Sequence, residues 1–342
     1  MRTHFLTFSP SAALRTTTAS SATDTLTTDA QASERVGVQA VALYVALAYG
    51  WSWGLAGVYF GGGFAVEDAL AFTVMGVAFM YGPAVGALVV KKLVRGRPLA
   101  EIGMRLAFNR WWLVAWLAPL ALAGTAGAFS VFVPGAHFVI SVEGVVEQVL
   151  ATAPAGVATE GDTEEVRALG AWLPLILVGG ALFNGATVAA VAAFGEEVGW
   201  RGFLQNELAP LGFWNASGVV GIVWGLWHAP LILAGYNYPE HPVLGVFMMT
   251  LMTVLLAPLF AYVAMRARTV LAAALMHGAF NTTAGLTLFF VAGGPRLATG
   301  MTGAAGLAAL ACANALLFFH RRRTVSQNEP ENQKTINPEN QQ

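Results

Sequence analysis

The chain has 342 residues, of which 56% are hydrophobic and only 11% are charged, and its formal net charge is −1. A soluble globular domain carries roughly 25% charged residues, so this composition excludes an ordinary soluble protein and indicates one that lies in a membrane. A near-neutral chain without a basic stripe has no electrostatic support for binding nucleic acid, and the single cysteine, Cys312, excludes an intrachain disulfide.

The two ends of the chain are polar. Residues 1–34 are rich in Thr, Ser and Ala without apolar periodicity, and residues 324–342 are rich in Asn, Gln and Pro. Such segments bury too little apolar surface to offset the entropy lost on folding. Both are therefore predicted to be disordered tails, and the first lacks the apolar stretch that a signal peptide needs.

Between the tails, long apolar runs predict about eight membrane-spanning helices, because several runs exceed the ~18 residues that mark a spanning helix. Backbone groups in lipid must be hydrogen-bonded within their own segment, so we expect helices. The expected fold class is an all-α, polytopic membrane helix bundle. The predicted spans are residues 36–60, 68–90, 111–133, 172–195, 214–235, 243–265, 270–291 and 298–319.

Basic residues occur in alternate connectors between these spans. They fall within residues 91–110, at Arg266 and Arg268, and at residues 321–323, whereas the connector 134–171 is acidic. Cytoplasmic connectors of membrane proteins are enriched in Lys and Arg. The pattern predicts a multi-pass integral membrane protein whose basic connectors and two termini are cytoplasmic.

Strong polar groups gather in the second half of the chain, within or beside apolar runs. Burying such groups in a membrane costs several kcal/mol, so each is a functional candidate. They are Glu196, Glu197 and Arg201 in "GEEVGWR", His228 in "WGLWHAP", and His277 and Asn281 in "MHGAFN".

Their helical spacing suggests how they are grouped. Glu197 and Arg201 are four residues apart and can form an ion pair, as can neighbours on one helix face. Glu196 points about 100° away from Glu197 around the helix axis. His277 and Asn281 are again four apart and should project from one face.

Together these residue types can hydrolyse an amide bond. A carboxylate and an imidazole can activate water, directly or through a metal ion, and a second imidazole with an amide can stabilise an oxyanion. A structural interpretation competes for each residue alone. A single membrane histidine is more often a hydrogen-bonding group between helices, and for Glu197 and Arg201 a structural ion pair is the favoured reading.

The ordered motifs "EEVGWR", "WGLWH" and "HGAFN" resemble those of the CAAX protease and bacteriocin-processing family of intramembrane proteases, which includes the Ras-converting CaaX endopeptidase. The resemblance implies an intramembrane endopeptidase that hydrolyses a peptide bond near the membrane surface. It implies that Glu196 and His228 activate water, that His277 and Asn281 stabilise the oxyanion, and that Glu197 and Arg201 orient the site. It further implies a water-filled chamber open to the cytoplasmic leaflet.

The resemblance leaves the cofactor open between a divalent metal such as zinc and a metal-free glutamate mechanism. If a metal is used, Glu196, His228 and His277 are its expected ligands, although the HExxH zinc motif is absent. The expected partners are membrane lipid and a peptide or protein substrate, with a lipidated C-terminus as one candidate, and no nucleic acid. His241 is interpreted as an ordinary loop residue.

The resemblance also sets the expected organisation of the chain. Residues 35–171 form the N-terminal transmembrane helices and connectors, residues 172–291 the protease-like catalytic core, and residues 292–323 the last transmembrane helix, between the tails 1–34 and 324–342. Two other functions compete with a protease. A non-proteolytic membrane immunity or scaffold protein of the same fold would be favoured by a lost motif residue, and none is lost. A proton-relaying transporter would show an internal repeat, and none is evident.

Overall fold

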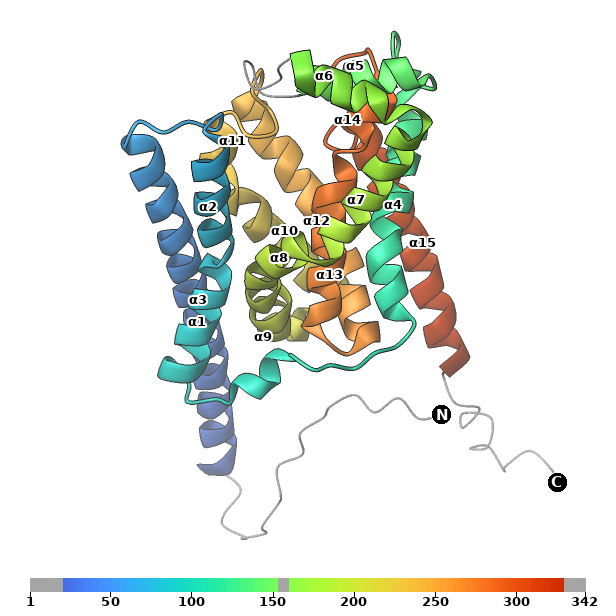
Figure 1. Ribbon diagram of the computed structural model, residues 1–342. Coiled ribbons are helices and arrows are strands. Elements are labelled where there is room, and N and C mark those ends of the chain that lie inside the picture. Colours follow the sequence, from blue (N-terminus) through green and yellow to red (C-terminus); the bar gives the residue numbers. More distant parts are fainter. Residues whose placement is uncertain (1–20, 153–159, 329–342) are drawn as a thin grey trace, which may run out of the picture. The chain divides into compact units, whose positions relative to one another are not determined.

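The computed structural model describes residues 21–152 and 160–328. The part of the chain after Ala42 forms one compact unit, shown in Figure 1. In the first half the elements are α1 (Ser21–Gly61), α2 (Ala69–Met80), α3 (Gly82–Leu88), the π-helix η1 (Val89–Val94), the 3-10 helix η2 (Leu99–Ile102), α4 (Trp111–Ser130), β1 (His137–Phe138), α5 (Val142–Thr152) and α6 (Glu160–Ala168). In the second half they are η3 (Gly170–Trp172), α7 (Leu173–Ala186), α8 (Val188–Gly199), the π-helix η4 (Trp200–Leu204), α9 (Gln205–Glu207), η5 (Ala209–Leu211), α10 (Phe213–Trp227), α11 (Ala229–Leu233), α12 (Pro242–Ala267), α13 (Val270–Ala284), α14 (Thr287–Phe290), β2 (Val291–Ala292) and α15 (Ala304–Asn328).

The all-α polytopic fold class is confirmed, but the number of spans differs from the sequence expectation. By length and composition, five helices of the described chain can cross a membrane, or six if one bent pair counts as a span. The candidates are Gly37–Gly61, Ala69–Val94, Trp111–Ser130, Pro242–Ala267 and Ala304–Thr324, with the bent pair Gly170–Ala186 and Val188–Glu207.

Two expected spans, residues 214–235 and 270–291, are interrupted. The helices α10 and α13 have 15 residues each, and such a helix is about 22 Å long, shorter than the ~30 Å hydrocarbon core. The next helix after α10 begins with Pro230 in its first turn, and proline has no N–H to continue a helical ladder. A continuous apolar run can therefore contain a helix break, because the break depends on backbone hydrogen bonding and not on hydrophobicity.

The bend between α7 and α8 occurs at Thr187. This residue has φ −119° and ψ −98° and belongs to neither helix, and the two helical segments meet at 42°. Its hydroxyl donates to the carbonyl oxygen of Phe183 at 2.8 Å, which satisfies one of the carbonyls left free at the end of α7. The bend directs α8 into the centre of the bundle.

Pairs of glycines let the central helices approach closely. Gly195 and Gly199 on α8 face α2 and α3, and a Cβ on Gly199 would overlap Pro83. Gly221 and Gly225 on α10 likewise face the backbone of α12. The small-xxx-small spacing of "GEEVG" and "GIVWG" thus marks real helix contacts.

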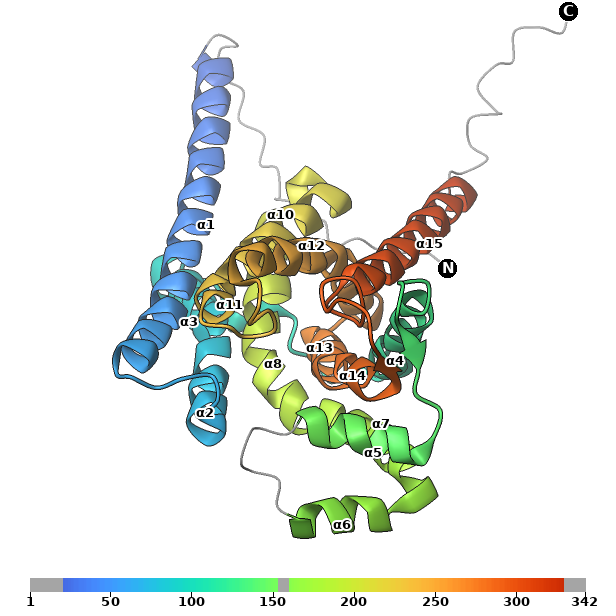
Figure 2. The ribbon, with the colours of Figure 1, turned by 90° about the horizontal axis from the view of Figure 1, so that it is seen from above.

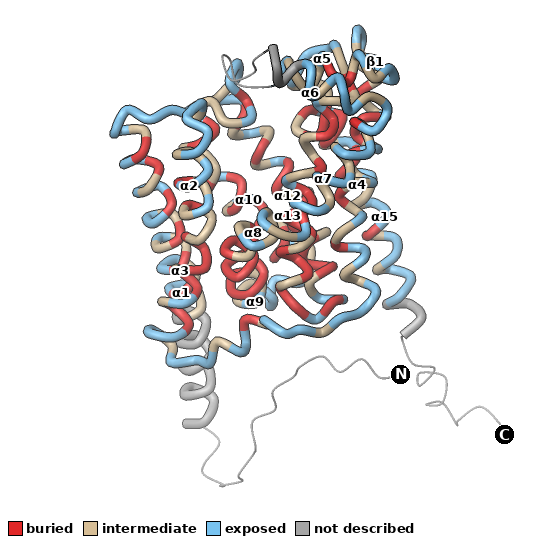
Figure 3. The backbone as a smooth tube through the Cα atoms, in the orientation of Figure 1, coloured by how far each residue is buried: buried red, intermediate tan, exposed pale blue. Residues whose placement is uncertain are grey.

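Burial is highest in the central helices. Figure 3 shows buried residues concentrated on α8, α12 and α13, with exposed positions along α2 and α15. Helix α13 packs against α4, α7, α8 and α12, and α8 and α13 lie side by side from both directions of view (Figures 1 and 2). The exposed positions include large apolar side chains such as Leu70, Val74 and Leu316, as expected for helices that face lipid.

The two ends of the bundle differ in charge. At one end the basic connectors meet: Asn109 donates to the carbonyl oxygen of Ala267 at 3.2 Å, and the Arg266 guanidinium lies 5.2 Å from the Trp111 ring. Arg321 of α15 reaches the same cluster, 5.9 Å from the Tyr262 ring. At the other end, at the top of Figure 1, lie the described parts of the long connector, residues 131–152 and 160–170, and the loops that follow α1, α11 and β2.

The predicted tails are only partly covered by the described residues. Residues 21–34 are the start of α1 and residues 324–328 the end of α15, so these parts are helical where disorder was expected. Extending a formed helix costs far less than nucleating one, which explains why polar sequence can continue these helices. Residues 1–20 and 329–342 lie outside the described chain, as do residues 153–159 of the acidic connector. The predicted division of the chain into parts stays a prediction. Helix α13, from the expected catalytic core, packs against α4, from the expected N-terminal part.

Candidate active site

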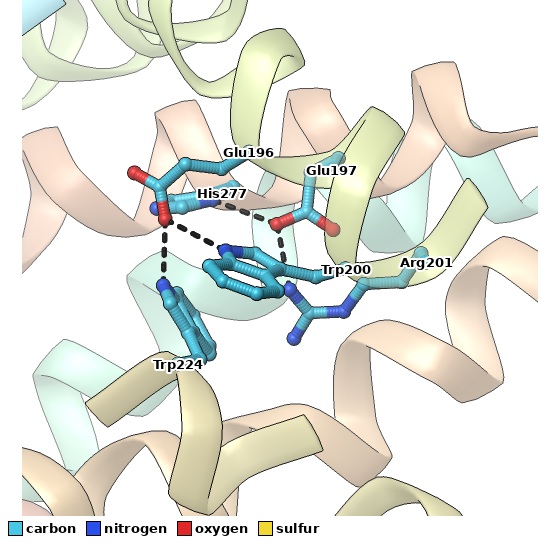
Figure 4. Close-up of polar contacts among 6 residues, drawn as sticks. All are labelled: Glu196, Glu197, Trp200, Arg201, Trp224 and His277. Carbon is cyan, nitrogen blue, oxygen red and sulfur yellow. Dashed lines mark hydrogen bonds and ion pairs between the residues drawn. The ribbon is translucent and has the colours of Figure 1, made fainter. Parts of the chain in front are cut away.

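Glu196 lies near the end of α8 and is held by two indoles. Its Oε2 accepts a hydrogen bond from Trp224 Nε1 at 2.6 Å and a longer one from Trp200 Nε1 at 3.3 Å. The residue is only 2% exposed. Figure 4 shows its second oxygen free of contacts to the other residues drawn. Two N–H donors stabilise a buried negative charge, so one oxygen is anchored and the other is left for a ligand.

Glu197 points to a different side of α8 and holds two partners. Its Oε1 lies 2.8 Å from the Arg201 guanidinium and 2.8 Å from His277 Nδ1 (Figure 4). The ion pair expected from the four-residue spacing is present, whereas the contact with His277 brings together residues 80 positions apart. Carboxylates fix the orientation of an imidazole in this way.

Arg201 is buried between aromatic rings. Its guanidinium carbon lies 4.6 Å from the ring centre of Trp224 and 4.9 Å from that of Phe260. The residue lies in the π-helix η4 and is 4% exposed. Cation–π contacts and one ion pair together offset the cost of burying its charge.

His228 follows the last residue of α10. Its Nδ1 lies 2.9 Å from the carbonyl oxygen of Trp224. A carbonyl can only accept a hydrogen bond, so Nδ1 carries the proton and Nε2 of the neutral ring keeps its lone pair. Trp224 therefore contacts both proposed water-activating residues, Glu196 through its indole and His228 through its backbone.

Asn281 lies on α13 one turn after His277. It is exposed, and none of the hydrogen bonds found among the described residues involves its side chain. The amide is therefore available to a ligand. As expected from their spacing, both residues face the same cavity.

That cavity has a volume of about 620 Å³ and contains all four proposed catalytic side chains. Glu196, His228, His277 and Asn281 come from three separate segments of the chain, and all four line the cavity. Its outer part is formed by the connector after α1, with Glu67, by residues 235–241, and by residues 296–302. His241, which the sequence suggested to be an ordinary loop residue, lies at this outer part.

The cavity opens at the end of the helices opposite the basic connectors. The sequence analysis expected both that the basic connectors are cytoplasmic and that the chamber opens to the cytoplasmic leaflet. The loops that line the cavity lie at the top of Figure 1 and the basic connectors at the bottom, so these two expectations cannot both hold.

A larger hollow of about 1,090 Å³ lies elsewhere, between α2, α4, α8 and α13. It is lined by apolar side chains such as Trp112, Trp116 and Phe194, and Thr187 is the one polar residue lining it. It contains none of the candidate catalytic residues. Without a titratable group it offers no acid–base chemistry.

The proposed metal ligands do not form a metal site in this arrangement. Among the described side chains, those of residues 37–152 and 164–324, no three of His, Cys, Asp or Glu lie close enough together to hold a metal ion. Glu196 and His277 instead bond to indoles and to Glu197. The donor set therefore does not fit zinc, which takes at least three protein ligands in catalytic sites.

The sequence analysis gave no role to the supporting aromatic residues. Trp224 belongs to the motif "WGLWH", four residues before His228, but its bond to Glu196 was not predicted; Trp200, four residues after Glu196, could have been suggested by the same helical spacing. Phe260 comes from α12 and carries no comparable signal. Of the other histidines, His137 lies in β1 and His320 in α15, while His4 lies outside the described residues.

The fold and the site define a class of protein: a polytopic membrane helix bundle with a buried carboxylate–histidine site open to a cavity. Residues 178–283 match the family described as Type II CAAX prenyl endopeptidase Rce1-like. This segment contains all six candidate residues, and its match confirms the resemblance stated from the motifs. No curated protein shows a significant match to the chain.

Proposed function

We propose that this protein is an intramembrane endopeptidase that hydrolyses a peptide bond near the membrane surface. The observation that carries the proposal is the convergence of Glu196, His228, His277 and Asn281 on one cavity. The match of residues 178–283 to the Rce1-like prenyl endopeptidases supports a peptide as the substrate. A lipid-anchored peptide suits a protein whose helices lie in the bilayer.

Glu196 and His228 activate the attacking water in this proposal. The free oxygen of Glu196 accepts a proton from water while the hydroxide oxygen bonds to the scissile carbonyl carbon. His228 Nε2 accepts a hydrogen bond from the same water and fixes its direction of attack. The proton then passes to the leaving amine as the C–N bond breaks, which regenerates the carboxylate.

His277 and Asn281 receive the oxyanion. Glu197 Oε1 holds His277 Nδ1 at 2.8 Å, so the imidazole presents its opposite nitrogen, Nε2, to the cavity. An Nε2–H there can donate to the oxyanion, alongside the Asn281 amide.

Glu197 and Arg201 act as positioning residues. Glu197 orients His277, and Arg201 holds the Glu197 carboxylate in place through their contact of 2.8 Å. The proposal uses no metal ion, because the ligands that one would need are engaged in other contacts. Hydrolysis then depends on the carboxylate of Glu196 as the base.

The test is cleavage of a quenched fluorescent farnesylated CaaX peptide by the detergent-purified protein. We expect turnover by the wild type and a loss of about 10²–10⁴-fold in Glu196→Gln and in His228→Gln, the range for removing a general base. Glu143→Gln, at an exposed position of α5, is the control and should retain full activity. Normal turnover by folded Glu196→Gln would overturn the assignment. If neither the wild type nor any variant cleaves this peptide, a different peptide substrate or the non-proteolytic immunity or scaffold protein is favoured.

A further inference from the structure

The catalytic cavity and the basic connectors lie at opposite ends of the same bundle. Eleven Lys and Arg residues lie in the basic segments: Lys91, Lys92, Arg95, Arg97, Arg105, Arg110, Arg266, Arg268, Arg321, Arg322 and Arg323. None of them lines the cavity. The connectors at the cavity end carry Arg167 and Arg296 but also a larger number of carboxylates, including Glu67, Glu143 and Glu240.

Local contacts hold each end together, so the separation does not depend on flexible loops. At the basic end, Val270 donates its backbone N–H to the carbonyl oxygen of Gly103 at 3.2 Å. At the cavity end, the Tyr238 hydroxyl donates to the carbonyl oxygen of Thr302 at 2.8 Å. The strands β1 and β2 pair there as well, with His137 opposite Ala292.

The charge asymmetry orients the bundle in a membrane. Short connectors rich in Lys and Arg stay on the cytoplasmic side, and anionic lipids of the cytoplasmic leaflet attract them. The opposite end, where Glu67 and Glu240 border the cavity, then faces the other side. The buried Glu196 is reached from that side.

We propose that the cavity receives its peptide from the non-cytoplasmic face of the membrane, so that the substrate is an extended segment of an exported or membrane-anchored polypeptide. The nature of this substrate rests on the proposed protease function, whereas the sidedness rests on geometry and charge alone. A prenylated tail made in the cytoplasm would reach the opposite end of the bundle. The inference therefore replaces the cytoplasmic opening expected from the family resemblance.

Thiol labelling tests the sidedness without any use of activity. Cys312 is the single cysteine, so Cys312→Ala gives a background in which Glu240→Cys or Glu67→Cys marks the cavity end. Arg97→Cys and Arg323→Cys mark the basic end, and all four positions are exposed. Spheroplasts of an expression host are treated with a membrane-impermeant sulfonated maleimide, before and after permeabilisation.

We expect Glu240→Cys and Glu67→Cys to be labelled in intact spheroplasts as fully as after permeabilisation, and Arg97→Cys and Arg323→Cys to be labelled only after it. The reverse pattern, or labelling of both ends in intact spheroplasts, would overturn the proposal. Two positions at each end keep the test decisive if one variant fails to accumulate.

A second arm connects sidedness with catalysis. The quenched peptide is added outside right-side-out and inverted vesicles that contain wild type or Glu196→Gln. Cleavage by wild type in right-side-out vesicles alone supports the proposal, and cleavage in inverted vesicles alone overturns it. If labelling gives the expected pattern but no vesicle cleaves the peptide, the sidedness stands and the proposed cleavage of a farnesylated CaaX peptide is what fails.

Discussion

At the scale of the residue, Trp224 links the two groups proposed to activate water. Its indole N–H donates to Glu196 at 2.6 Å, and its backbone carbonyl accepts from His228 at 2.9 Å. Its ring also packs against the Arg201 guanidinium. One tryptophan thus fixes the rotamer of the base, the tautomer of the histidine and part of the environment of the buried cation.

Trp224→Phe should slow cleavage while preserving the ring. A hydrogen bond to a charged group contributes about 1.5–3 kcal/mol, so we expect kcat to fall about 10- to 100-fold. Trp116→Phe is the matched control, because it also removes an indole hydrogen bond, to Leu182, but at a distance from the site. Steady-state kinetics with thermal unfolding of each variant measure the effect; equal losses in both variants would contradict a specific role for Trp224.

The ion pair of Glu197 and Arg201 has two effects: it stabilises the fold, and its carboxylate orients His277. A double substitution can separate the two. Both side chains are almost completely buried, with 0% and 1% exposure. Removing one partner of such a pair leaves an uncompensated charge and costs about 3–5 kcal/mol. His277 is oriented by the same carboxylate.

Glu197→Gln should therefore lower the unfolding free energy by about 3–5 kcal/mol, and Glu197→Gln/Arg201→Met should recover most of it, because the buried charge is gone. Activity should stay low in the double variant, since His277 has lost its carboxylate partner. The control is Glu207→Gln, which breaks the more exposed Arg95 pair and should cost about 0–1 kcal/mol. Recovery of activity together with stability would show that Glu197 has no positioning role.

At the scale of the element, helix breaks and glycine contacts place the site. Helix α8 carries Glu196 and Glu197 after the bend at Thr187, and α10 ends one residue before His228. Glycines on both helices lie against neighbouring backbone. The positions of α8 and α10 therefore determine where the site side chains lie. A substitution that displaces either helix at a glycine contact should also displace these side chains.

Gly225→Ala should destabilise the bundle and reduce activity. Its Cβ would overlap the backbone of Thr250 on α12, and overpacking of this kind costs typically 1–3 kcal/mol. Because Gly225 lies between Trp224 and His228, cleavage should fall as well. Gly218→Ala on the same helix meets no atom within 4 Å and should be neutral or stabilising by up to ~1 kcal/mol. Unfolding midpoints of the two variants in detergent decide the comparison; equal midpoints would refute the close contact.

At the scale of the bundle after Ala42, tertiary packing brings α8, α10 and α13 around one cavity but assembles no set of three metal ligands among the described residues. A site that holds zinc needs at least three such ligands at about 2.0–2.3 Å from one point. The cavity instead brings together one buried carboxylate, two histidines and an amide, which is the set proposed for a metal-free mechanism.

Removal of metal ions should therefore leave the proposed cleavage activity unchanged. We expect the same cleavage rate after treatment with EDTA or 1,10-phenanthroline as before it, and no increase on addition of Zn²⁺. The measurement is the fluorescent peptide assay, with a zinc-dependent protease treated in parallel to verify chelation. Inactivation that Zn²⁺ reverses would show that the residues rearrange around a metal ion.

The sequence by itself determined that this protein lies in a membrane, that it is helical, and which residues are candidates for the site. Low charge and long apolar runs require a membrane, and polar groups are costly there, so the few that occur inside the spans stand out. The four-residue spacing of Glu197 and Arg201 was sufficient to predict their ion pair, because such neighbours lie on one helix face.

Only the tertiary structure decided which groups meet and which way the cavity opens. The contact of Glu197 with His277 and the bond from Trp224 to Glu196 join residues that are 80 and 28 positions apart, and no local periodicity encodes such distances. The breaks before α11 and after α13 lie inside continuous apolar runs. The cavity is bounded by connectors at one end, and its direction follows from how the helices pack, which hydrophobicity alone does not specify.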